Sequence, residues 1–279
     1  MDSPGEDVRG RFEDRRLITG QGSFTADQRR DGLLHARFAR AAIACGRLIS
    51  IDVSAARSAP GVAAVFTADD LARDGILDLA TDIDPPRDDG GKGFGTLRPF
   101  LARDRVRFVG EPIALVVAET AMAAADAAAF VAPDIQAEPA VVSRADALAP
   151  GAPSVWPEMA DNIAFVRRFG DESTVRAAIS RAAHVTRLSL DVSRVVAATL
   201  EPRAALGECD TAGRLVLTTS TQAPFALRNR LADEVFRVDR SAIRVIAPDI
   251  GGSFGMKGGV YREDVLVLWA ARKLERPVL

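Results

Sequence analysis

The sequence predicts a mixed α+β fold, because segments with the alternation of strands and segments with helical periodicity follow one another along the chain. Its 279 residues, 48% of them hydrophobic and 27% charged, can form one large domain or two ordinary domains with a buried core. The stretch 145–162 combines prolines and small residues with little periodicity, which is typical of a connection between domains.

The first half of the chain should contain several strands and one strong helix. Thr120 precedes an alanine-rich segment and carries the hydroxyl that an N-cap needs, so a helix is expected at 121–131. A tight turn is expected at 110–112 and an exposed loop at the glycine- and charge-rich stretch 82–95. Extended segments are predicted at 32–41, 46–53, 62–66, 106–119 and 134–142.

The second half alternates in the same way and ends on an unusual helix. Helices are predicted from about Asp171 and at 225–236 and 262–274, and strands at 185–192, 213–222 and 243–250. The last helix is apolar on nearly every face and must be covered on several sides. We therefore expect either a partner chain that completes this domain or a longer polypeptide of which these residues are a part.

The bulk composition argues against several classes of partner. A net charge of −2 and a pI of about 5.8 give no reason to expect a nucleic-acid or anionic-membrane partner. Apolar runs such as 113–118 are too short to span a bilayer, and the polar N-terminus is no secretory signal, so the expected location is cytoplasmic. The two cysteines and two histidines lack metal-ligand spacing, so no directly ligated metal is expected in this chain.

The stretch "GGSFGMKGG" at 251–259 is the main candidate for a binding element. Its spacing matches neither a P-loop nor a dinucleotide fingerprint, and Glu263 and Asp264 just behind it would repel a phosphate. Two interpretations remain open. The small residues let backbone N–H groups approach a ligand closely, or the stretch is a tight turn with Phe254 as an ordinary core residue.

Two further polar segments lie near predicted strand ends. Gln222 could place an amide at a pocket mouth or serve in a capping turn. Glu201 and Arg203 could be a pocket acid and its partner, but a surface salt bridge is the simpler expectation. No set of residues with the spacing of a catalytic triad or a carboxylate pair can be identified.

Several ordered motifs resemble the molybdenum hydroxylases, the large molybdopterin-binding subunits of the xanthine dehydrogenase, aldehyde oxidase and carbon monoxide dehydrogenase family. The motifs are "RFEDRRLITGQGSFTAD", "VRFVGEPIALVVAET", "EPRAAL", "TSTQAP" and "RVIAPDIGGSFGMK". The resemblance runs from about Arg11 to the last residue and implies the N-terminal portion of such a subunit. It implies a lead-in at 1–20, an α/β hammerhead domain at 21–149, and a first molybdopterin-binding domain at 150–279 that is incomplete at its C-terminus.

The resemblance also implies which residues meet the cofactor. The Gln222 position approaches the apical oxygen ligand of molybdenum in the family, and the Phe254 position lies over the substrate pocket. The implied cofactor-binding residues are Gln222, Gly251, Gly252, Ser253, Phe254 and Gly255. No residue of this chain is expected to ligate the metal directly, and none is expected to be catalytic, because the family's catalytic glutamate lies beyond residue 279.

The implied activity is the oxidation of an aldehyde, an N-heteroaromatic ring or a similar small substrate with oxygen from water. The cofactor would be molybdenum-molybdopterin, in its cytosine dinucleotide form, shared with residues outside this chain. The remaining molybdopterin-binding half, an iron–sulfur subunit with 2Fe-2S clusters and an FAD subunit are the expected partners. The alternative is a truncated or scaffold subunit that keeps the fold, binds no cofactor and is inactive.

Two positions depart from the family pattern. Ser253 stands where glycine is usual, which adds a Cβ to the loop. Gly258 stands where the purine-oxidising branch has an acid that contacts substrate, so a purine substrate is not expected.

Overall fold

The computed structural model describes residues 10–81, 86–87, 90–159 and 161–279. Part of the loop predicted at 82–95 therefore lies outside the described residues. The short strands β4 (Leu79–Ala80) and β5 (Leu97–Arg98) flank this stretch and pair antiparallel. Among the described residues, no helix combines the length and the apolar character that crossing a bilayer requires.

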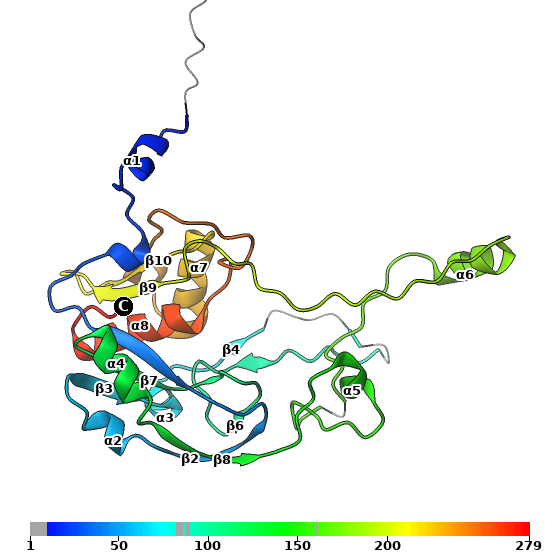
Figure 1. The fold of residues 1–279 in the computed structure, drawn as a ribbon, viewed down its shortest axis with the longest axis horizontal. Coiled ribbons are helices and arrows are strands. Elements are labelled where there is room, and N and C mark those ends of the chain that lie inside the picture. Colours follow the sequence, from blue (N-terminus) through cyan, green and yellow to red (C-terminus); the bar gives the residue numbers. More distant parts are fainter. Residues whose placement is uncertain (1–9, 82–85, 88–89, 160) are drawn as a thin grey trace, which may run out of the picture.

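The first part of the fold is built from two three-stranded antiparallel sheets and short helices (Figure 1). One sheet has β7 (Pro112–Ala118) between β1 (His35–Arg40) and β3 (Val62–Phe66), and all seven residues of β7 are buried. The other has β2 (Gly46–Asp52) between β6 (Arg105–Val106) and β8 (Ala132–Ala137). The fully apolar sequence of β7 therefore marks a central strand that is covered on both faces.

Local sequence signals in this part are confirmed. The Thr120 side chain accepts a hydrogen bond of 3.1 Å from the Ala123 N–H and starts α4 (Ala121–Ala128), which packs on β1 and β7. Gly110 has φ of 89° in the predicted tight turn. The remaining helices of this part are α2 (Ser54–Arg57), α3 (Ala68–Arg73) and α5 (Arg144–Leu148).

The second part contains a three-stranded sheet in the order β11 (Ile243–Ile246), β10 (Leu215–Thr219), β9 (Ala205–Cys209). β10 runs parallel to β11 and antiparallel to β9. The sequence patterns did not predict β9. The predicted helix at 225–236 begins as α7 (Pro224–Arg230) and continues as a π-helical segment, η2 (Leu231–Phe236), before the 3₁₀ turn η3 (Arg240–Ala242).

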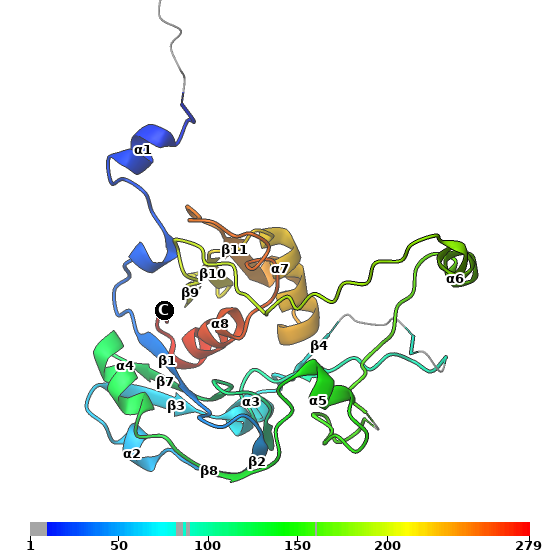
Figure 2. The ribbon, with the colours of Figure 1, turned by 45° about the vertical axis from the view of Figure 1, so that its right-hand side comes forward.

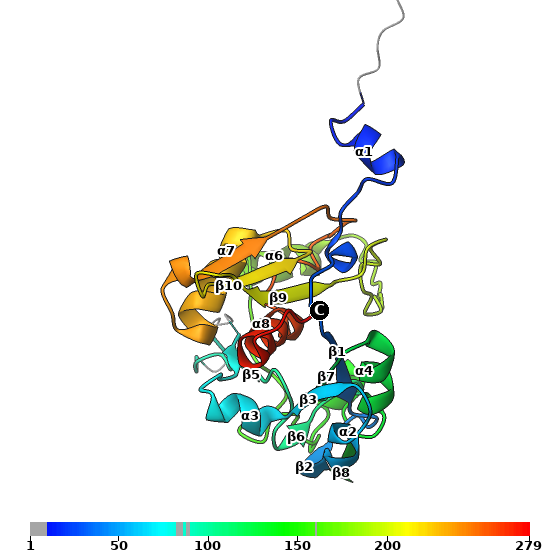
Figure 3. The same ribbon diagram turned by 90° about the vertical axis from the view of Figure 1, so that its left-hand side faces the viewer.

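The last helix, α8 (Arg262–Leu274), lies between this sheet and the β1–β7–β3 sheet (Figure 3). Its residues 264–271 are all buried, and the Trp269 ring meets the Phe66 ring edge-on at 4.7 Å. Just beyond the helix, Val278 forms bridges with both Leu34 and Gly207. The helix is thus covered by this chain itself, and the two parts share one hydrophobic core.

One long segment has no place in that core. The helix α6 (Glu172–Arg181) begins at its predicted N-cap, Asp171, but it and the extended chain on either side stand away from the body (Figures 1 and 2). The strand predicted at 185–192 is wrong, because this segment pairs with no described strand. Its apolar side chains are open to solvent, and Val192 is 91% exposed.

Candidate functional site

The candidate site lies where two parallel strands end. Gln222 follows β10, and the loop 251–258 follows β11 and leads into α8. Because the carboxyl ends of parallel strands meet at one edge of a sheet, the fold brings these segments together. The Ser253 hydroxyl donates a short hydrogen bond to Oε1 of Gln222. The extra atoms of Ser253 therefore connect the loop to Gln222.

The first residue of the loop is held by Glu201. Oε2 of Glu201 accepts the Gly251 N–H at 2.8 Å, and the Glu201 N–H donates to the Gly251 carbonyl at 3.2 Å. A Cβ on Gly251 would lie 2.5 Å from Cβ of Glu201, so only glycine fits between these partners. The Gly251 N–H is consequently engaged within the protein.

Glu201 does not pair with Arg203, so the expected surface salt bridge is wrong. Its carboxylate instead meets the Lys257 ammonium at 2.8 Å, and the Lys257 side chain is 0% exposed. Arg203 lies 3.7 Å above the Tyr261 ring and 3.6 Å from the Glu263 carboxylate. In the segment 201–203, Glu201 therefore contacts the loop, and Arg203 contacts Tyr261 and Glu263 at the start of α8.

Phe254 is presented to solvent in an unusual backbone conformation. Its φ is 49°, in the left-handed region that aromatic residues rarely adopt, and the residue is 81% exposed. The interpretation of Phe254 as an ordinary core residue is therefore wrong. Exposed apolar rings on strained backbone are found at ligand sites, which makes this residue a functional candidate.

Several hydrogen-bond donors of the loop have no protein acceptor. Within the part of the chain that the structure describes, the N–H groups of Gly252, Ser253, Phe254 and Gly255 donate to no protein atom. Nε2 of Gln222 likewise has no acceptor among the described residues. These donors lie around one loop, where a bound group rich in acceptors would find them together.

The far end of the loop is fixed by a buried acid. Asp264 accepts hydrogen bonds from the Thr219 hydroxyl at 2.9 Å and from the Tyr261 N–H at 3.1 Å. Burial raises the pKa of Asp264 to about 6, although both hydrogen bonds act in the opposite direction. Asp264 caps α8 at its N-terminus and also ties that helix to β10.

The near end of the loop is fixed by the N-terminal segment. The carboxylate of Asp249 pairs with the Arg16 guanidinium and accepts the Ser23 N–H at 2.7 Å. The hydrogen bond from Arg16 lowers the pKa of Asp249 to about 2, with the Ser23 N–H contributing in the same direction. The lead-in helix α1 (Asp14–Ile18) is attached to the body through this contact.

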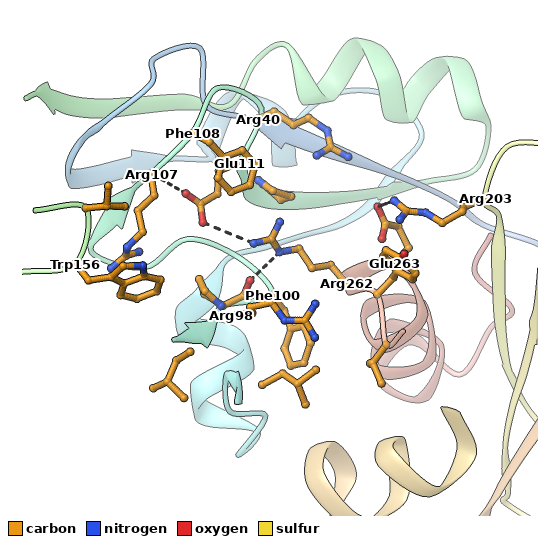
Figure 4. Close-up of a pocket in the computed structure, with 17 residues that line it drawn as sticks. Arg40, Arg98, Phe100, Arg107, Phe108, Glu111, Trp156, Arg203, Arg262 and Glu263 are labelled. Atoms are coloured by element: carbon orange, nitrogen blue, oxygen red, sulfur yellow. Dashed lines mark hydrogen bonds and ion pairs between the residues drawn. The ribbon is translucent and has the colours of Figure 1, made fainter. Parts of the chain in front are cut away.

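A separate cleft of about 570 Å³ lies between the two parts (Figure 4). Glu111, which is 2% exposed, accepts the Arg107 N–H at 2.6 Å and lies 3.7 Å from the Arg262 guanidinium. Nε of Arg262 donates to the Pro99 carbonyl at 2.8 Å, and the Arg107 guanidinium stacks 3.9 Å from Trp156. Burial raises the pKa of Glu111 and lowers that of Arg262. These arginines join the two parts, and neither Gln222 nor 251–255 lines the cleft.

Two family models match the chain. The aldehyde oxidase and xanthine dehydrogenase a/b hammerhead domain matches residues 19–139, and the molybdopterin cofactor-binding domain matches residues 155–279. The chain is 37% identical over 96% of its length to the nicotine 6-hydroxylase large subunit of Paenarthrobacter nicotinovorans. It is 31% identical over 95% of its length to the carbon monoxide dehydrogenase large chain of Hydrogenophaga pseudoflava.

The structural comparison agrees with these matches. The crystal structure of quinoline 2-oxidoreductase from Pseudomonas putida 86 superposes with a TM-score of 0.88 and 33% identity, covering 96% of this chain. The chain belongs to the molybdenum hydroxylase large-subunit family. It spans about a third of the length of these relatives: 32% of the nicotine hydroxylase subunit, 33% of the carbon monoxide dehydrogenase chain and 33% of the quinoline enzyme.

The loop 251–255 has room and donors for a bound group rich in acceptors. Gly252, with φ of 101°, has no Cβ in the narrow space beside Thr199, and four adjacent N–H groups and the Gln222 amide have no acceptor among the described residues. A Cβ on Gly258 would lie 3.2 Å from Nε2 of Gln222, so a larger residue there would crowd that amide. The assignment of Gln222 and 251–255 to the cofactor stays a prediction.

Sequence patterns missed the residues that support the loop 251–258. Lys257 lies in the stretch whose spacing excludes a P-loop, and its partner Glu201 lies 56 positions earlier. The one available signal was a lysine inside an otherwise apolar and glycine-rich stretch, which has to find a counter-charge if it is buried.

Proposed function

We propose that this chain forms one wall of the molybdenum-molybdopterin site of a multi-subunit hydroxylase or dehydrogenase. One observation carries the proposal: at a single sheet edge, Nε2 of Gln222 and four N–H groups of 252–255 have no acceptor among the described residues, and the same loop presents an exposed Phe254 on left-handed backbone. Because the chain spans about a third of its relatives, the opposite wall belongs to polypeptide outside these residues.

The residues have distinct roles in this proposal. When bound, the cofactor supplies the two-electron oxidation of a substrate carbon with oxygen from water. Nε2 of Gln222 donates a hydrogen bond to an oxygen atom of the bound group, and its orientation is held by Ser253. The N–H groups of 252–255 hold the cofactor, and the Phe254 ring covers the substrate. None of these groups transfers a proton, so the isolated chain has no turnover.

The finer parts of the proposal follow the relatives. Nicotine 6-hydroxylase and quinoline 2-oxidoreductase are named for N-heteroaromatic compounds, which supports a substrate of that kind. The aldehyde oxidase in the description of the matching hammerhead domain supports an aldehyde as the alternative. The names "large subunit" and "large chain" support further subunits as partners, and we propose an iron–sulfur and an FAD subunit among them. We propose the cytosine dinucleotide form of the cofactor and a cytoplasmic location.

Kinetics of the assembled complex test the proposal. The chain is tagged at its N-terminus and purified with its bound partners from the cells that make it, and oxidation of quinoline, nicotine and benzaldehyde is followed with a dye as electron acceptor. Gln222→Ala should lower kcat about 10²-fold, because a hydrogen bond to the reacting centre is lost. Phe254→Ala should raise KM for aromatic substrates about tenfold.

The matched control is Phe130→Ala, which removes an exposed ring from the first part of the fold. It should leave both constants unchanged. Normal kinetics in Gln222→Ala and Phe254→Ala would contradict the proposal. A purified complex without molybdenum or turnover would instead identify the chain as a scaffold that keeps the fold alone.

A further inference from the structure

A buried ion pair lies directly beneath the candidate loop. Nζ of Lys257 is 2.8 Å from Oε2 of Glu201, and the two side chains are 0% and 9% exposed. The same Nζ donates to the Glu201 backbone carbonyl at 3.0 Å. Removing two opposite charges from water is costly, so a pair of this kind is weak evidence for a role in stability alone. The contacts of the pair with the loop and with Gln222 indicate a second role.

The acid of the pair controls the beginning of the loop. The carboxylate oxygen that meets Lys257 also accepts the Gly251 N–H, and the Glu201 N–H returns a bond to the Gly251 carbonyl. Gly251 is thus clamped from both sides by one residue. Any displacement of the Glu201 side chain moves the start of the segment that carries Phe254.

The lysine of the pair controls the other element of the site. Its backbone carbonyl accepts the Gln222 N–H at 3.1 Å and the Thr221 hydroxyl at 3.2 Å. The position of Gln222 therefore depends on where Lys257 lies, and Lys257 is fixed through its ammonium by Glu201. One residue connects the end of β10 to the loop after β11.

We propose that Glu201 and Lys257 are positioning residues that fix Gln222 and the loop 251–255 relative to each other. The role of the positioned groups rests on the proposed function, but the positioning itself does not. Neither residue touches a bound group in this assignment. They act through Gly251 at one end and through the Lys257 carbonyl at the other.

Hydrogen exchange on the 279-residue chain, without cofactor, tests the positioning. Lys257→Met keeps the length of the side chain and removes its charge, and Glu201→Gln keeps the shape and an acceptor. The double variant Glu201→Gln/Lys257→Met leaves no unpaired charge. Each should raise exchange of the Gly251 and Gln222 amides by about tenfold or more, while the amides of β7 stay unchanged. The exchange rates of these amides in the double variant should be close to those in each single variant, because the pair acts as a unit.

The control is Lys273→Met, which removes an exposed lysine that pairs with Asp74 at the same 2.8 Å distance. It should leave exchange at Gly251 and Gln222 unchanged. If the single variants unfold, the double variant decides. Unchanged exchange at both amides in a folded variant would overturn the proposal. An equal rise throughout the double variant, β7 included, would also overturn it, because the pair would then be a general stabiliser.

Kinetics of the assembled complex provide the second readout. With molybdenum content unchanged, Lys257→Met should lower kcat more than it raises KM, because misplaced groups lose transition-state contacts first. Altered exchange with unaltered kinetics would support the positioning and contradict the proposed function. The two proposals can therefore fail separately.

Discussion

Nε1 of Trp269 donates a hydrogen bond of 2.9 Å to the carboxylate of Asp74. Trp269 belongs to α8 of the second part and to the common core, and the exposed Asp74 follows α3 of the first part, so this polar contact joins the two parts beside their common core. Lys273, one turn further along α8, meets the same carboxylate at 2.8 Å. The hydrogen bond from Lys273 lowers the pKa of Asp74 more than the one from Trp269 does. The helix that enters from the candidate loop is thus anchored at its other end.

Substitution of Trp269 should lower the stability of both parts of the fold. Trp269→Ala removes a fully buried ring and should lower the free energy of unfolding by about 3–5 kcal/mol. Trp269→Phe should cost less than that, because Asp74 keeps Lys273 as a partner. Urea unfolding followed by circular dichroism measures both values. Losses below about 0.5 kcal/mol in both variants would show that the contact between α8 and α3 is not part of the folded core.

Gly207 should tolerate no side chain. A Cβ at this position of β9 would lie 2.4 Å from the Val267 carbonyl oxygen, so the strand or the helix α8 must shift to admit it. Gly207→Ala should destabilise the protein by about 1–3 kcal/mol. The matched control is Gly259→Ala, whose Cβ meets no atom within 4 Å. Thermal unfolding compares the two, and equal midpoints would be inconsistent with the close packing of α8 on β9.

Asp264 should make the stability depend on pH between about 4 and 6. Its pKa is about 6 in the fold against 3.8 for an unperturbed aspartate, so the fold favours the protonated form. Protonated Asp264 therefore contributes about 3 kcal/mol to the free energy of unfolding below about pH 4. This contribution is lost as the pH rises to about 6. In Asp264→Asn the loss disappears, so the variant should gain stability relative to the parent as the pH rises. Urea midpoints from pH 4 to 7 that keep a constant difference would refute this.

The extended segment around 185–196 should exchange its amides as freely as an unfolded chain. Its backbone pairs with no described strand, whereas every residue of β10 is buried and residues 215–218 are paired on both sides. Hydrogen exchange detected by mass spectrometry compares the two segments in the 279-residue chain. Protection of 185–196 similar to that of β10 would mean that the segment has a strand partner in solution.

Local sequence patterns predicted those elements whose determinants are local. The Thr120 cap, the apolar strand β7 and the helix α8 each depend on neighbouring residues, and each lies where it was expected. The strand at 185–192 was predicted from the same alternation and did not form, because a strand also needs a partner edge. β9 was missed for the converse reason. Its short sequence includes Gly207 and Glu208, and it is a strand because β10 and α8 cover it.

The candidate site divides in the same way. The motifs placed Gln222 and the glycine loop at strand ends, and the fold makes these strands neighbours and brings the two segments into contact through Ser253. The support from Glu201 and Lys257 could not be predicted, because 56 residues separate the two partners and a lysine in a glycine-rich stretch does not indicate which acid it meets. The family resemblance implied Gln222 and 251–255, and the structure identified Glu201 and Lys257 as the residues that fix them.

The molybdenum content of the complex purified through this chain tests the central proposal most directly. Metal analysis should find about one molybdenum atom per chain, together with a pterin released on denaturation, and none on the 279-residue chain purified alone. Replacing Gly252 by valine, which crowds the space beside Thr199, should lower that content without unfolding the complex. A complex that turns over substrate without molybdenum, or that keeps its full molybdenum content in Gly252→Val, would contradict the assignment of this loop to the cofactor.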